Sequence, residues 1–148
     1  MEGGFNKNFL IGVELVRRKY ITQDQLDEGL ILQQRKKIRL GEALIELGYL
    51  SEDDLAKVLA DQLSIPYIDF KTCEIAEDAL GQMPLELIKS NTVIPVKFDN
   101  NILTVCVVDP LDSHLKNFLE EYMSIPINIA IAGKTAIRNA IDRYYQYD

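Results

Sequence analysis

The sequence predicts an α+β fold: an N-terminal helical layer made of a duplicated helix-turn-helix, then a small three-stranded sheet with helices on one side. Three observations support this prediction. Apolar residues recur at helical spacing through the first 64 residues. Ile65-Pro66 then ends the helical pattern, because a proline disfavours helix at the residue before it. Two runs rich in β-branched residues flank Asp99-Asn100-Asn101, which is a hairpin turn signal.

Residues 39–62 form the clearest helical unit and read as helix, tight turn and helix. Apolar residues recur on one face from Leu40 to Leu47. Gly48 is placed to end the first helix, because glycine accepts the left-handed conformation of a C-terminal cap. Ser51 is a good N-cap for the second helix, and the three acidic residues after it suit the helix dipole.

The same unit occurs earlier in the chain. A shift of 29 residues lays residues 10–33 over 39–62, with seven of 24 positions identical. Thr22 and Gln25 fit a capping box in the first copy. Two copies are too few for a solenoid but are enough for a compact four-helix layer. Helices are therefore expected near 8–19, 23–35, 39–47 and 52–63.

The second half of the chain is predicted to alternate short helices and strands. An extended segment at 67–70 leads into two short helices between residues 76 and 90. The later elements are strands at 92–98, 102–108 and 127–132 and helices at 111–123 and 135–145. We therefore expect a helical subdomain at 1–64 and an α+β subdomain at 65–148.

Charge and composition exclude several classes of function. The net charge of −7 argues against general nucleic-acid binding, which depends on basic patches. Basic residues do cluster at Arg17–Lys19 and Arg35–Arg39, and they are either solvated helix ends or a patch that faces phosphate or a partner. With His114 as its one histidine, the chain offers no metal-ligand spacing.

The cysteines and the lengths of the apolar segments indicate the cellular compartment in which the protein is expected. Cys73 and Cys106 match no metal pattern and are expected to be buried or neutral thiols in a reducing compartment. No stretch approaches the roughly 18–20 apolar residues that span a bilayer, and no signal peptide is evident. We expect a soluble, cytoplasmic protein without direct membrane insertion.

No catalytic constellation emerges from the residues. Gly133-Lys134-Thr135 is similar to the end of a phosphate-binding loop, but a strand pattern precedes it where that loop would need length. The acidic runs at 52–54 and 120–121 are expected to be a helix N-terminus and an exposed helix face. Asp109 is expected to serve a turn. The chain is therefore not expected to be an enzyme.

Arg39 and Gln62 are the strongest functional candidates. A guanidinium makes bidentate bonds to phosphate, and a glutamine amide both donates and accepts. Gly41 would let a ligand approach the helix start, where N–H groups favour anions. Apolar Leu40 and Leu44 could cover the faces of a base. The structural alternative is a surface arginine and a glutamine that bonds between helices.

The repeat resembles the tandem motif of the N-terminal domain of GspE, PilB and MshE, which are type II secretion and type IV pilus ATPases. In that family each motif runs R-L-G, aliphatic pairs, a glycine, and spaced aliphatics that end in glutamine, with five residues between the copies. The second copy matches almost throughout. The first copy departs at Leu10, where the arginine should be, and at Lys19, where the second glycine should be.

The resemblance implies a non-catalytic domain that docks the motor onto the cytoplasmic part of an inner-membrane platform protein. An ATPase domain would act in cis or in trans, and the chain would lie in the cytoplasm or peripherally at the inner membrane. Some family members bind cyclic di-GMP across both motifs. The corresponding residues here are Arg39, Leu40, Gly41, Leu44 and Gln62, with Gly12 and Gln33 from the first copy. No other cofactor is implied.

Overall fold

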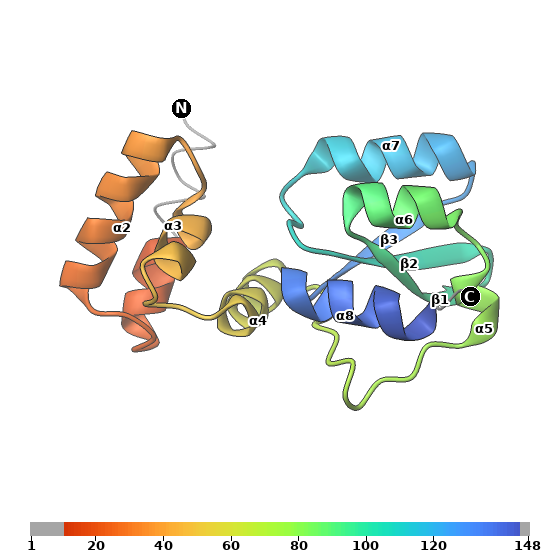
Figure 1. Ribbon diagram of the computed structural model, residues 1–148, viewed down its shortest axis with the longest axis horizontal. Coiled ribbons are helices and arrows are strands. Elements are labelled where there is room, and N and C mark those ends of the chain that lie inside the picture. Colours follow the sequence, from red (N-terminus) through yellow and green to blue (C-terminus); the bar gives the residue numbers. More distant parts are fainter. Residues whose placement is uncertain (1–10, 146–148) are drawn as a thin grey trace. The chain divides into compact units, whose positions relative to one another are not determined.

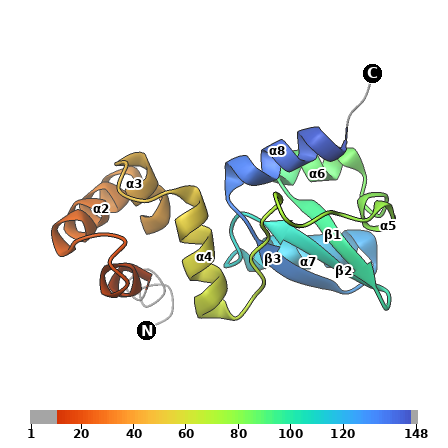
Figure 2. The same ribbon diagram turned by 90° about the horizontal axis from the view of Figure 1, so that it is seen from below.

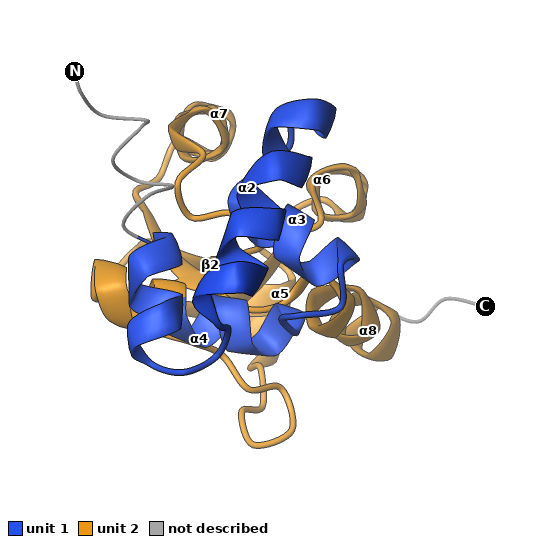
Figure 3. Cartoon of the chain, turned by 90° about the vertical axis from the view of Figure 1, so that its left-hand side faces the viewer, with its two compact units in different colours: residues 1–58 blue, residues 59–148 orange. Residues whose placement is uncertain are grey.

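The computed structural model describes residues 11–145, and the chain divides into two compact units between Val58 and Leu59 (Figure 3). The division falls inside helix α4 (Glu52–Leu63), whereas the boundary predicted from the sequence lies just after this helix. Each unit buries apolar side chains of its own.

The first unit is helical, as the sequence predicts. Residues 11–17 are helical, and α2 (Gln23–Lys36), α3 (Leu40–Glu46) and the start of α4 follow. The predicted capping box at the start of α2 is confirmed: Thr22 Oγ1 accepts the Gln25 amide at 3.1 Å, and Gln25 Oε1 accepts the Thr22 amide at 2.9 Å. The largest fully buried side chains of this unit are Leu15, Leu40, Leu44 and Val58.

The two copies of the repeat end their first helices in the same way. Lys19 and Gly48, at equivalent positions, both have left-handed backbone conformations, with φ of 67° and 81°. The amide that follows each of them donates to a carbonyl five residues earlier, that of Leu15 or Leu44, at 3.0 Å. The backbone turn is thus conserved between the copies although only the second has the expected glycine.

The second unit contains a three-stranded sheet in the order β1-β2-β3 (Figure 1). β1 runs antiparallel to β2, and β2 runs parallel to β3, which requires the crossover that α7 supplies. Asn100 and Asn101 form the predicted hairpin turn, both with positive φ. The elements are α5 (Glu77–Leu80), α6 (Leu85–Asn91), β1 (Ile94–Asp99), β2 (Ile102–Val107), α7 (Ser113–Met123), β3 (Ile127–Ile131) and α8 (Lys134–Tyr144).

Helices α6, α7 and α8 cover one face of this sheet, as predicted (Figure 2). Leu103 and Val105 of β2 and Ile127 of β3 belong to the covered face and are at most 2% exposed. On the opposite face, Thr104 and its partner Asn128 remain accessible. The extended segment predicted near residue 67 pairs with the end of β3.

Several predicted boundaries need correction. The first strand begins at Ile94 instead of Thr92, because Thr92 has a left-handed conformation that ends α6. Helix α7 begins at Ser113, because the Asp112 side chain accepts the Leu115 amide and caps it. Leu63, whose helical spacing after Leu55 and Leu59 would place it on the apolar face of α4, is 40% exposed.

Candidate functional site

The repeat glycines fill the same packing role in both copies. A Cβ added at Gly41 would lie 2.5 Å from a methyl carbon of Leu55, and one at Gly12 would lie 2.7 Å from a methyl carbon of Leu26. Leu26 and Leu55 are themselves equivalent positions. Each glycine therefore lets the leucine of the paired helix approach its backbone. The leucine side chain fills the space beside the glycine Cα.

The apolar members of the predicted site belong to the helical core. Leu40 and Leu44 are both fully buried. Gly29 of α2 packs against them, since a Cβ there would lie 2.7 Å from Leu44 and 3.3 Å from Leu40. This contact joins the first copy of the repeat to the second.

The polar members of the predicted site are more accessible. Arg39 is exposed at the N-cap of α3, where its amide donates to Glu42 Oε1 at 3.3 Å. Gln33 is half-buried on α2. Gln62, on the last turn of α4, is exposed and belongs to the second unit. Position 10, where the first arginine of the repeat would stand, lies outside the described residues.

Some of the clustered basic side chains are held by acidic neighbours. Arg17 and Arg18 both bond to Glu14, and these bonds, first from Arg17 and then from Arg18, lower the pKa of the Glu14 carboxyl. Lys36 Nζ contacts both carboxylate oxygens of Glu46, at 2.8 and 2.9 Å. This second pair links the end of α2 to the end of α3.

One contact in this unit has no signal in the sequence. The Tyr49 hydroxyl donates to Glu28 Oε1 at 2.5 Å, which joins the turn after α3 to α2. The bond to Glu28 raises the pKa of Tyr49. Residues 28 and 49 lie 21 positions apart, so the pairing follows from the packing of the two copies.

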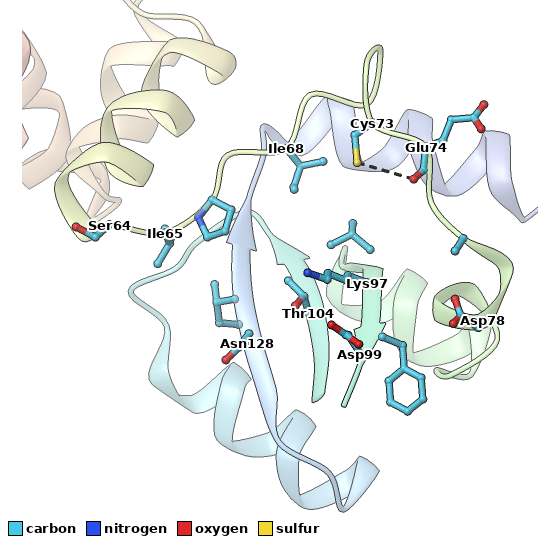
Figure 4. Close-up of a pocket in the computed structure, with 15 residues that line it drawn as sticks. Ser64, Ile65, Ile68, Cys73, Glu74, Asp78, Lys97, Asp99, Thr104 and Asn128 are labelled. Atoms are coloured by element: carbon cyan, nitrogen blue, oxygen red, sulfur yellow. Dashed lines mark hydrogen bonds between the residues drawn. The ribbon is translucent and has the colours of Figure 1, made fainter. Parts of the chain in front are cut away.

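A groove of about 890 Å³ lies on the open face of the sheet in the second unit. Lys97, Asp99 and Thr104 extend from the sheet into it, and Ile68 and Cys73 border it from the preceding loop (Figure 4). The sequence analysis did not single out this groove, although polar residues in β1 mark an accessible strand face. Its mixed lining resembles the solvated face of an antiparallel sheet.

The end of α8 holds the loop and α5 in place. The Tyr145 hydroxyl donates to the Leu80 carbonyl at 2.8 Å, and the Tyr144 hydroxyl accepts the Ile75 amide at 3.3 Å. Burial raises the pKa of Tyr145 to about 12. Adjacent tyrosines thus fix two separate points of the segment that leads into β1.

The predicted non-catalytic positions take structural roles. Only two residues, Ala132 and Gly133, lie between the end of β3 at Ile131 and the start of α8 at Lys134, so no phosphate-wrapping loop forms there. Asp109 Oδ1 accepts the Leu111 amide at 3.0 Å, as its predicted turn role requires. Glu120 differs from the exposed residue expected, because it is half-buried and its Oε2 accepts the Ile127 amide at 3.1 Å.

The cysteines, the potential metal ligands and the helices of the described residues each bear on a prediction from the sequence. Both cysteines are free, and burial raises the pKa of the Cys106 thiol. Among residues 11–145, no group of three or more potential ligands is placed to hold a metal ion. Within the same residues, every helix is too short or too polar to cross a membrane.

Comparison with known proteins identifies the domain. The sequence model of the MshEN domain matches residues 63–148. The chain belongs to the MshEN domain family. This match lies in the α+β part of the chain, whereas the resemblance noted from the sequence rests chiefly on the helical repeat.

Relatives cover both parts of this MshEN domain. The type IV pilus assembly ATPase PilB of Myxococcus xanthus is 30% identical over 135 residues, which is 91% of this chain. A structure of MshE with cdg is 29% identical, with a TM-score of 0.79, and covers 91% of this chain and 98% of that one. The N-terminal domain of XpsE, at 22% identity and a TM-score of 0.75, shows the same fold.

The MshEN domain is a small part of its curated relatives. The chain spans 24% of the Myxococcus xanthus PilB and 15% of the Thermus thermophilus PilB. It therefore corresponds to one part of these type IV pilus assembly ATPases and not to their whole length.

Proposed function

We propose that this MshEN domain is a non-catalytic interaction domain that docks a secretion or pilus motor onto the cytoplasmic part of an inner-membrane platform protein. The ATPase domain acts with it in cis or in trans. The domain works in the cytoplasm, peripherally at the inner membrane through its partner. Its relationship to PilB and MshE supports a role within such a motor.

One surface of the first unit carries this proposal. Ile31 on α2 is 58% exposed, the largest exposure among the large hydrophobic side chains of the described residues. Arg35 lies one helical turn further along the same face, and Lys37 follows the helix end, both exposed. An apolar anchor beside exposed positive charge suits a partner segment that combines apolar and acidic residues.

Binding assays with the cytoplasmic parts of platform proteins from the same cell test the docking role. We expect Ile31→Asp to weaken binding at least tenfold, because it places a charge in the apolar contact. Phe118→Ser, which changes an exposed apolar residue of the other unit, is the matched control. Failure of the wild-type chain to bind any candidate would contradict the docking role.

A second candidate function is sensing of cyclic di-GMP. Two observations support it: the similarity to MshE, whose structure contains cdg, and the nearly complete second copy of the repeat. Arg39, Gln33 and Gln62 would supply polar contacts. Leu40 and Leu44 are fully buried and Gly12 and Gly41 are buried, so the accessible surface of this candidate site comes chiefly from the three polar residues.

Calorimetric titration of cyclic di-GMP into the whole chain tests this second function. We expect low-micromolar binding that Arg39→Ala weakens ten- to a hundredfold, since a hydrogen bond to a charged group contributes about 1.5–3 kcal/mol. Arg35→Ala, outside the repeat motif, is the control. Absence of heat at high ligand concentration would exclude sensing and leave the repeat as a scaffold.

A further inference from the structure

Helix α7 exposes two aromatic side chains on its outer face. Phe118 is 45% exposed and Tyr122 57%, and their ring centroids lie 6.1 Å apart. Exposed aromatic clusters on otherwise polar surfaces are typical of protein interfaces. The fold does not require them, because Leu119 of the same helix is fully buried and supplies the contact with the core.

Three apolar side chains of α7 follow the spacing of a helix–helix interface. Leu115, Phe118 and Tyr122 lie at i, i+3 and i+7, which places them in one line along the helix. Phe118 and Tyr122 are exposed, whereas Leu115 is half-buried at the edge of the core and offers only its outer part. We call these three residues the α7 stripe. A stripe with this spacing packs against another helix that crosses at a small angle.

Charged and polar residues beside the stripe make it self-complementary. His114 and Glu121 are both exposed, lie seven residues apart and occupy the same flank. If two α7 helices pair antiparallel about a two-fold axis at Phe118, His114 of each copy meets Glu121 of the other. A parallel pair would instead match Glu121 with itself, which is unfavourable.

We propose that the α7 stripe binds a second copy of this chain through an antiparallel, two-fold pair of α7 helices. Phe118 packs on its counterpart at the axis, and Tyr122 packs on Leu115 of the other copy at each end. Helix α7 has 11 residues and is about 16 Å long, so the buried area falls below the roughly 1,200 Å² of a stable dimer. The association is therefore weak and concentration-dependent.

Sedimentation equilibrium of the whole chain, from about 10 μM to 1 mM, tests this proposal. We expect the average mass to rise from that of a monomer toward that of a dimer across this range. The double variant Phe118→Ser, Tyr122→Ser should weaken association at least tenfold, while Val13→Ser, at an exposed apolar position of the first unit, should leave it unchanged. Circular dichroism verifies that each variant is folded.

A charge exchange tests the antiparallel register. His114→Glu places two carboxylates opposite each other and should weaken association several-fold, and Glu121→Lys added to it should restore association. A chain that stays monomeric at 1 mM would overturn the proposal, as would a dimer insensitive to the serine variants. A heterologous partner that binds the stripe of a monomeric chain would overturn it too.

Discussion

At the scale of single residues, the two copies of the repeat reach the same backbone turn with different side chains. Gly48 adopts its left-handed conformation without steric cost, and a Cβ there would meet nothing within 4 Å. Lys19 holds the same conformation with a Cβ, which costs about 1 kcal/mol. The left-handed conformation of Lys19 is therefore set by the packing of the helices on either side of the turn and not by a residue that favours it.

Substitutions at these two positions should change the free energy of unfolding in opposite directions. We expect Lys19→Gly to stabilise the chain by about 0.5–1 kcal/mol and Gly48→Ala to destabilise it by about 1 kcal/mol, as measured by denaturant unfolding. Gln34→Gly, inside α2 and exposed, is the control and should cost about 1 kcal/mol. A destabilising Lys19→Gly would show that the lysine side chain has another role.

Tyr145 makes stability depend on pH at the alkaline end. Its pKa is about 12 in the folded chain and about 10 when unfolded, so folding favours the protonated phenol. This contribution is complete below pH 10 and is lost as the pH rises from 10 to 12. Tyr145→Phe should remove this part of the pH dependence and cost about 1 kcal/mol at pH 7 through the lost bond to Leu80.

Urea unfolding of both forms at pH 7, 10 and 11 checks this expectation. Tyr144→Phe, which affects the neighbouring contact with Ile75, is the comparison and should keep the alkaline loss that Tyr145 causes. Equal alkaline slopes for wild type and Tyr145→Phe would assign the loss to other groups.

At the scale of elements, the repeat is a helix pair that closes around a glycine. In each copy the first helix contributes the glycine and the second contributes the leucine that covers it. Because the same contact recurs 29 residues later, the sequence similarity between the copies is largely explained by packing. A ligand role for Gly12 and Gly41 would have to act in addition to this contact.

Alanine at the repeat glycines should therefore be costly. We expect Gly12→Ala and Gly41→Ala each to destabilise the chain by about 1–3 kcal/mol, because the new methyl group overlaps a leucine. Gly81→Ala should be tolerated, since the nearest atom to its added Cβ lies 3.7 Å away. Thermal unfolding monitored by circular dichroism measures all three. Stability changes close to zero for Gly12→Ala and Gly41→Ala would show that the paired helices move apart easily.

At the scale of the whole molecule, the second unit has a complete core. Its buried cluster runs from Ile75 to Ile141 and consists wholly of residues from that unit. The match of the MshEN model to residues 63–148 covers nearly the same range. Apolar burial of this kind is what a domain needs to fold alone.

The fragment 59–148 should therefore fold without the helical repeat. We expect a cooperative thermal transition and mixed helix and strand signals in circular dichroism. The fragment 1–58 is the counterpart and should unfold at a lower temperature, because its second repeat loses the end of α4. A broad, non-cooperative transition for 59–148 would show that its core depends on the first unit.

The sequence alone determined the order of the elements and the repeat. Helical spacing, cap residues and the Asn100-Asn101 turn act locally, so they predicted most helices and strands to within two residues. The resemblance to the GspE, PilB and MshE family also rested on local patterns such as Arg39-Leu40-Gly41, and the family assignment confirmed it.

Tertiary structure decided what the repeat residues contact. Leu40 and Gly41 suit either a ligand or a helix–helix contact; the structure shows the helix–helix contact, with Leu55 packed against Gly41 and Leu40 fully buried, and their ligand role stays a prediction. The bonds from Tyr49 to Glu28 and from Tyr145 to Leu80 join residues far apart in sequence, so no local pattern predicts them. The same packing decides which apolar side chains stay exposed and can contact a partner. A helical sequence pattern specifies an apolar stripe but not what covers it.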